Sequence, residues 1–145
     1  MIRTLAGGYP VVDLNDPKQV HKDQRLRSDP IIWLCSVRPD GRPHAAAVWF
    51  LWDGSSILIF SMPTAQKLRN LRHEPRVTLA LDDTHAGDDP ITLEGTAEIL
   101  EPSVVTTQLP AYAEKYGELM KEIDLPPDKM AQIYSQPIRI TPTCF

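Results

Sequence analysis

Apolar and polar residues alternate along residues 91–100 with the period of two that is typical of a half-buried β-strand. Threonine and glutamate occupy the even positions from 92 to 98, where they would face water. The positions expected to face a core are Ile91, Leu93, Gly95, Ala97 and Ile99. The pattern predicts one strand of a sheet with a dry face and a wet face.

Shorter apolar runs, bounded by proline, glycine and aspartate, predict further strands. They cover residues 31–37, 44–52, 57–61, 76–81 and 137–141. The sequence PDGR at 39–42 and the pair Asp53-Gly54 are typical of tight turns, so the first three strands should pair antiparallel. Consecutive antiparallel strands of this length predict a small barrel.

Four helices are expected between and after these strands. Asn15, Asp16 and Pro17 form a helix start with a capping side chain and a proline in the first turn. The predicted helices cover residues 17–27, from Pro63 or Thr64 to 73, 103–121 and 127–134.

The stretch 44–52 is apolar on both faces. One face would carry Ala45, Ala47, Trp49 and Leu51, and the other Ala46, Val48, Phe50 and Trp52. One of them can meet the barrel core, but the second needs a flat aromatic ligand, the C-terminal helices or another subunit to cover it. We favour a homodimer with a ligand between its subunits.

Composition indicates an ordinary globular protein. The chain has 145 residues, of which 42% are hydrophobic and 23% charged, so we expect residues 1–145 to form a single domain. No apolar stretch approaches the roughly 20 residues needed to cross a bilayer, which argues against a membrane protein. The first residues lack the apolar core of a secretory signal, which predicts a cytoplasmic protein. The two cysteines do not make a disulfide framework.

The distribution of charge points to a small anionic ligand. A net charge of −4 argues against nucleic-acid binding. Nevertheless, residues 67–76 carry four basic residues and one acid, Glu74. The four histidines show no metal-ligand spacing, so we expect no metal centre, and we find no acid–base or nucleophile motif.

The strongest candidate for anion binding is the segment that joins Ser61 to Lys67. A strand that ends on a serine and turns into a helix places a hydroxyl, backbone amides and an ammonium within reach of one phosphate. A lysine near a helix start also opposes the helix dipole unless an anion lies beside it. The alternatives are that Ser61 caps a strand end or a turn, that Lys67 is solvated, and that Asn70 lies on the helix surface or holds the following loop by hydrogen bonds.

Five motifs, taken in their order and spacing, resemble one known family over nearly the whole chain. They are PDGRPHAAAVWF, IFSMPTAQKLRNL, RVTLALDD, ITLEGTAEIL and QPIRITPT. The chain resembles the pyridoxamine 5'-phosphate oxidase-like split β-barrels that bind FMN or coenzyme F420. The resemblance implies a mainly β, α+β fold: a six-stranded antiparallel split barrel with flanking helices.

The same resemblance implies a homodimer that holds its cofactor at the subunit interface. Ser61 and Lys67 would bind the phosphate, and Arg139 would approach from the partner subunit. The complete set of cofactor-binding candidates is Val48, Trp49, Phe50, Phe60, Ser61, Gln66, Lys67, Asn70 and Arg139. Of these, Val48, Trp49 and Phe50 would present backbone to the tricyclic ring, and Phe60 and Gln66 would flank the cofactor.

We therefore expect an oxidoreductase that uses reduced F420 to transfer hydride to a small conjugated substrate. Hydride chemistry resides in the cofactor, which explains why no catalytic residue is evident. F420 is favoured over FMN because Arg25, Arg27, Arg69 and Arg72 would suit its anionic glutamate tail if they lined one groove. The alternatives are an FMN-dependent enzyme of the same fold and a non-catalytic dimer that binds flavin or haem.

Overall fold

The computed structural model of the chain describes residues 2–4, 10–82 and 85–145. Residues 1 and 5–9, part of the segment inspected for a secretory signal, lie outside this range, as does Asp83 of the RVTLALDD motif. The strands are β1 (Ile2–Thr4), β2 (Pro10–Asp13), β3 (Ile32–Val37), β4 (Pro43–Val48), β5 (Leu51–Trp52), β6 (Ile57–Ser61), β7 (Arg76–Leu81), β8 (Thr92–Ile99) and β9 (Gln136–Cys144). The helices are α1 (Pro17–Ser28), α2 (Gln66–His73), α3 (Ser103–Glu122) and α4 (Pro127–Ile133).

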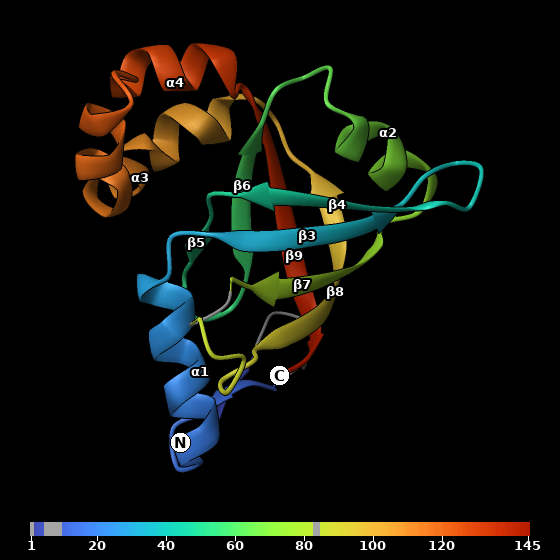
Figure 1. Ribbon diagram of the computed structural model, residues 1–145, viewed down its shortest axis with the longest axis vertical. Coiled ribbons are helices and arrows are strands. Elements are labelled where there is room, and N and C mark those ends of the chain that lie inside the picture. The colour runs from blue at the N-terminus through green and yellow to red at the C-terminus, as the bar shows by residue number, and fades with distance from the viewer. Residues whose placement is uncertain (1, 5–9, 83–84) are drawn as a thin grey trace.

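Seven of the strands form one antiparallel sheet in the order β4-β3-β7-β8-β9-β6-β5. Figure 1 shows β3, β4 and β7 running across β6 and β9, so the sheet curls over itself. Its two edge strands, β4 and β5, follow one another in the chain and are joined only by Trp49 and Phe50. This short link brings the two edges of the half-barrel together.

This link shows that the prediction of one continuous strand over residues 44–52 is wrong. The stretch 44–52 is not a single strand, because the chain leaves β3 after Val48 and Leu51 then pairs with Leu58 of β6 at the opposite edge of the sheet. The split antiparallel barrel is as expected, but its main sheet has seven strands instead of six. A further pair, β1 and β2, had no counterpart in the sequence prediction.

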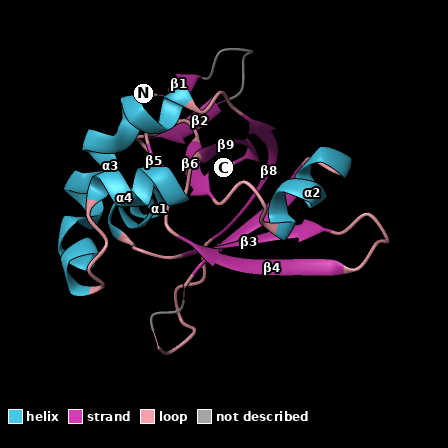
Figure 2. Cartoon of the chain, turned by 90° about the horizontal axis from the view of Figure 1, so that it is seen from above, coloured by secondary structure: helices cyan, strands magenta, loops and turns pink. Residues whose placement is uncertain are grey.

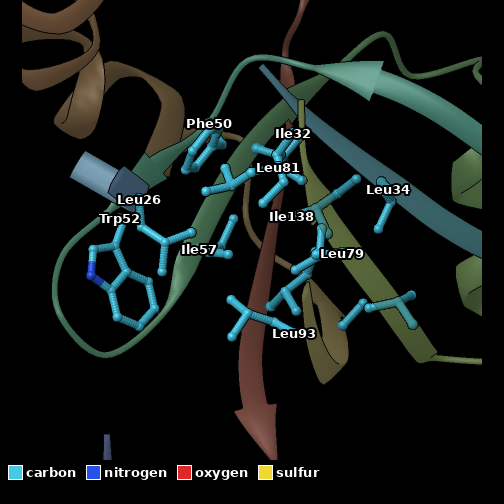
Figure 3. Close-up of a cluster of buried hydrophobic side chains, with 14 of the residues drawn as sticks. Leu26, Ile32, Leu34, Phe50, Trp52, Ile57, Leu79, Leu81, Leu93 and Ile138 are labelled. Atoms are coloured by element: carbon cyan, nitrogen blue, oxygen red, sulfur yellow. The ribbon is translucent and has the colours of Figure 1, made fainter. Parts of the chain in front are cut away.

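A hydrophobic core fills the inside of the curled sheet (Figure 3). Leu34, Ile57, Leu79 and Ile138 come from four different strands and are almost completely buried. The alternation predicted for 91–100 is confirmed, since β8 buries its odd positions and exposes its even ones up to Glu98. Gly95 belongs to the buried set, and β9 passes so close that a Cβ there would lie 2.8 Å from the Thr141 carbonyl oxygen.

A second hydrophobic cluster lies between the outer face of β6 and the helices α3 and α4. It contains Leu58, Phe60, Val105, Tyr112, Tyr116, Met120 and Met130, with Trp49 and Leu51 packed against it. The C-terminal helices are therefore one of the three covers considered for the second apolar face of 44–52. They do not extend over Ala45 and Ala47, which remain exposed on β4.

The four predicted helices are present, with shifted ends. Asp16 caps α1 as expected, accepting a hydrogen bond from the Lys18 amide at 2.9 Å. The second helix starts at Gln66 instead of Pro63 or Thr64, because residues before it form a turn in which the Ala65 amide donates to the Met62 carbonyl. None of the helices within the described residues combines the length and apolar character that a membrane crossing requires.

Candidate cofactor site

A cavity of about 210 Å³ opens where the end of β4 meets α2 and the α3–α4 helical pair. Figure 2 shows α2 beside one end of β3 and β4, and α3 and α4 beyond the other end of these strands. The lining residues are Ala47, Val48, Trp49, Phe60, Lys67, Tyr112, Ile123, Leu125, Met130 and Tyr134. Four of the predicted site residues, Val48, Trp49, Phe60 and Lys67, are thus brought together.

The link between β4 and β5 is held by α3. Because Trp49 and Phe50 belong to neither strand, their backbone groups need partners outside the sheet ladder. The Phe50 amide donates to the Tyr116 hydroxyl oxygen at 2.8 Å, and the Phe50 carbonyl accepts from the Lys115 ammonium at 2.9 Å. The Trp49 indole stacks on the Tyr116 ring, with centroids 4.5 Å apart.

A second tyrosine, one helical turn earlier, holds the other aromatic wall of the cavity. Tyr112 stacks on Phe60 with ring centroids 4.3 Å apart, and its hydroxyl lies beside the Phe60 backbone. Burial raises the pKa of Tyr112 well above its ordinary value, so the phenol is neutral. Two tyrosines of one helix therefore fix two cavity-lining segments that are distant in sequence.

Lys67 is the charged residue among those that line the cavity. It is half-buried, and within the described part of the chain no carboxylate forms an ion pair with it. Burial lowers the pKa of its ammonium. Holding an unpaired charge away from water costs free energy, which a bound anion would offset. A flat cofactor with an anionic group fits this combination of aromatic walls and an uncompensated cation.

Three other predicted residues form a hydrogen-bonded frame around the start of α2. The fully buried Ser61 donates its hydroxyl proton to the Met62 carbonyl at 2.9 Å. Gln66 donates to the Asn70 side-chain oxygen at 2.8 Å, and Asn70 donates to the Ser36 hydroxyl at 3.0 Å. Asn70 thus ties α2 to β3. Contacts from these residues to a cofactor stay predictions.

Phe50 and Arg139 do not line the cavity. The Phe50 side chain is fully buried in the inner core, and both of its backbone polar groups already have partners within the chain. Arg139 lies on β9 between Leu58 of β6 and Glu98 of β8 in the ladder. Their proposed roles, including the contact of Arg139 across a subunit interface, also stay predictions.

The condition under which Arg25, Arg27, Arg69 and Arg72 would favour F420, that they line one groove, finds no support, because two of them belong to α1 and two to α2. Arg25 and Arg27 belong to α1, where the Arg25 guanidinium pairs with Asp29 at 2.5 Å and with Asp89 at 3.1 Å. Arg27 pairs with Asp23 at 3.0 Å. Only Arg69 and Arg72 share a helix with Lys67. The basic side chains of α1 are engaged in holding that helix and its neighbouring loop.

Sequence reasoning missed the part of the lining supplied by α3, α4 and their connection. Tyr112, Tyr116 and Met120 recur every fourth residue and are all buried. This spacing places the three side chains on one face of α3 and indicates that this face packs against the rest of the protein. It does not reveal which strands that face meets, and therefore it could not place Tyr112, Leu125, Met130 or Tyr134 at the cavity.

The curled antiparallel sheet with helices at its open end defines a split-barrel protein. The family model for pyridoxamine 5'-phosphate oxidase matches residues 18–143, and the chain belongs to this family. No curated protein shows a significant match. The resemblance seen in the sequence motifs is thereby confirmed.

Solved structures give the same fold. An F420 reductase is 26% identical with a TM-score of 0.63, covering 83% of this chain and 93% of its own. A conserved hypothetical protein from Mycobacterium tuberculosis is 25% identical with a TM-score of 0.69, covering 97% and 86%. HutZ, a haem storage protein from Vibrio cholerae, is 17% identical with a TM-score of 0.67, covering 89% and 91%. The last likeness concerns the fold alone.

The described residues contain no group of three or more His, Cys, Asp or Glu side chains arranged to hold a metal ion. The histidines lie on separate elements, with His21 on α1, His44 on β4 and His73 on α2.

Proposed function

We propose that this protein is an oxidoreductase that uses reduced coenzyme F420 to transfer hydride to a small conjugated substrate. The observation that carries the proposal is the cavity itself, which has aromatic and aliphatic walls and a single charged lining residue, Lys67. Membership of the family and the likeness to an F420 reductase support it. An FMN-dependent enzyme of the same fold is the alternative.

Each part of the cavity has a separate task in this proposal. Lys67 would bind the cofactor phosphate by a charge-assisted hydrogen bond. Trp49, Phe60 and Tyr112 would pack against the tricyclic ring, and Leu125 and Met130 would keep water from it. When bound, the reduced cofactor supplies a hydride to an electron-poor carbon of the substrate. Among the described residues that line the cavity there is no carboxylic acid or histidine, and in this proposal water supplies the proton that completes the reduction.

We also propose that the protein is a homodimer with the cofactor at the subunit interface. The outer face of β3, β4 and β7 carries Trp33, which is 40% exposed and lies opposite Ala47 and Ala80 in the ladders. Cys35 lies opposite Ala45 on the same face. This surface of small and apolar side chains continues to the cavity through Ala47. A second subunit would cover it and bring Arg139 of the partner subunit toward the cofactor.

The structure weakens one of the arguments for F420 over FMN. With Arg25 and Arg27 engaged elsewhere, the argument from the anionic tail of F420 is reduced to Arg69 and Arg72. The preference for F420 therefore depends mainly on the 26% identical reductase.

The experiment is an anaerobic turnover assay with reduced F420 and, in parallel, reduced FMN. Purified protein is mixed with each cofactor and a panel of conjugated ketones and quinones, and reoxidation of the cofactor is followed by its absorbance. We expect substrate-dependent reoxidation of F420 by the wild type and a large loss with Lys67→Ala. Turnover with FMN alone would establish the alternative. Tight binding of either cofactor without turnover of any substrate would indicate a non-catalytic binding protein.

A further inference from the structure

His44 presents a buried polar atom with no partner. It lies on β4 directly opposite Ser36 of β3. Its Nδ1 is inaccessible to water. Among the buried side-chain nitrogen and oxygen atoms of the described residues, it is the one that forms no hydrogen bond. A buried ring nitrogen without a partner loses its hydration and gains nothing in exchange, at a cost in stability. An orphaned buried polar atom calls for an explanation, and a bound ligand is one that would give it a partner.

The surroundings of His44 are cationic. The charged groups that act on it are Arg38, from the turn after β3, and Lys67, from α2, and no carboxylate of the described residues is among them. Together with burial, these two cations lower the pKa of His44 below its ordinary value. In the free protein near neutral pH the imidazole is therefore uncharged.

Lys67 of α2 is near enough to His44 for its charge to act on the imidazole. Asn70, one turn after Lys67, is fully buried and donates to the Ser36 hydroxyl at 3.0 Å. Because Ser36 is the cross-strand neighbour of His44, this bond holds α2 against the part of the sheet that carries the histidine. Lys67 also lines the cavity, together with Val48 at the opposite end of β4 from His44.

We propose that His44 is a second binding residue for the phosphate of the cofactor and that it takes up a proton when the cofactor binds. The protonated ring donates its Nδ1–H to a phosphate oxygen, which gives the orphaned nitrogen a partner and places a second positive charge beside the anion. This inference rests on the proposed function, since it assigns a role at the same site.

The pH dependence follows from the direction of the shifts. A bound anion favours the charged imidazolium, so the pKa of His44 rises on binding from its lowered value in the free protein. Between these two values the bound form holds more protons than the free form. Affinity for the cofactor therefore increases as the pH falls through this interval and is constant above it.

Isothermal titration calorimetry of F420 in two buffers with different heats of ionisation measures the protons taken up. The variants are His44→Asn, whose amide can place a neutral donor near the Nδ1 position, and His44→Leu, which removes the polar group. His73→Gln is the matched control, since His73 is exposed at the end of α2. Ionisation of the deazaflavin itself is common to all four proteins and cancels when they are compared.

We expect the wild type and His73→Gln to take up more protons than either His44 variant. Affinity should fall roughly tenfold or more in His44→Leu, the value of a lost hydrogen bond to a charged group. His44→Asn should retain part of the affinity without the proton uptake. Equal affinity and equal proton uptake in all four proteins would overturn the inference while leaving the proposed function intact. Failure of the wild type to bind F420, FMN or inorganic phosphate would overturn both.

Discussion

The indole ring of Trp49 lies flat on the phenol ring of Tyr116, with planes 2° from parallel and centroids 4.5 Å apart. Trp49 belongs to the two-residue link that joins the edges of the half-barrel, and Tyr116 belongs to α3. The same tyrosine hydroxyl accepts from the Phe50 amide and lies 2.8 Å from the Pro30 carbonyl oxygen. One side chain thus fixes the link that closes the sheet and supports Trp49, which lines the cavity.

Removing this hydroxyl should destabilise the protein. In Tyr116→Phe the ring still stacks on Trp49, but the buried Phe50 amide loses its acceptor, which we expect to lower the free energy of unfolding by about 1–3 kcal/mol. Urea denaturation measures the change. Tyr134→Phe is the control, because no hydrogen bond of the Tyr134 hydroxyl is present in the described residues, and its effect should stay within about 0.5 kcal/mol. Equal effects of the two substitutions would contradict the role given to Tyr116.

Lys115 should make stability depend on pH. Burial lowers the pKa of its ammonium to about 8, from 10.5 for an exposed lysine. Between these values the unfolded chain holds more protons than the folded one, so the contribution of Lys115 to stability rises with pH in this interval. Below about pH 8 the folded protein carries the full penalty of the buried charge.

The measurement compares the wild type with Lys115→Met by urea denaturation at several pH values between about 7 and 9.5. The free energy of unfolding of the wild type, relative to that of Lys115→Met, should increase as the pH rises. Tyrosine ionisation affects both proteins and cancels. Lys121→Met, at an exposed position of the same helix, should show no such trend. A flat difference for Lys115→Met would mean that its ammonium is fully hydrated.

Two glycines should respond in opposite directions to alanine. A Cβ at Gly95 would lie 2.8 Å from both the Thr141 carbonyl oxygen and Ile140 Cγ2, so Gly95→Ala should cost about 1–3 kcal/mol through overpacking between β8 and β9. Gly117 lies on α3 with nothing within 4 Å of such an atom. Gly117→Ala should therefore stabilise the protein by about 0.5–1 kcal/mol through helix propensity. Thermal unfolding of the two variants beside the wild type measures both changes. A Gly95→Ala variant as stable as the wild type would show that β9 can move away from β8.

A charge on the outer face of β4 should break the proposed dimer. Ala45 is exposed there, so Ala45→Glu should fold normally, yet two such carboxylates would meet in the interface without partners. Light scattering after size-exclusion chromatography should give the mass of a dimer for the wild type and of a monomer for the variant. Thr106→Glu, at an exposed site on α3, is the control and should remain dimeric. A monomeric wild type would contradict the dimer proposal.

The sequence predicted most of the fold because its signals were local. The alternation in 91–100, the Asp16 cap and the turn at 39–42 each depend on neighbouring residues, and all appear where expected. The break at Trp49 and Phe50 was not predictable in this way. It exists because Tyr116 and Lys115, more than sixty residues away, supply the hydrogen bonds that a strand neighbour would otherwise give.

The candidate site was predictable in part for the same reason. Lys67 was singled out by its place near a helix start, and the structure brings it to a cavity. The positions of Arg25 and Arg27 could not be predicted, because the sequence does not show that these residues form ion pairs with acids of α1 and the β7–β8 loop. The helical wall formed by Tyr112, Met130 and Tyr134 depends on long-range packing, which no local pattern encodes.

The central claim is that the cavity beside Lys67 binds a phosphate-bearing deazaflavin. Fluorescence titration of F420 and FMN against the wild type and Lys67→Ala, at low and high salt, tests it most directly. We predict tight, salt-sensitive binding of F420 by the wild type and a loss of about 1–3 kcal/mol in Lys67→Ala, the range for a hydrogen bond to a charged group. Arg76→Ala, an exposed and ion-paired cation beyond α2, should bind as the wild type does. Unchanged affinity in Lys67→Ala, or no binding of F420 by the wild type, would contradict the account.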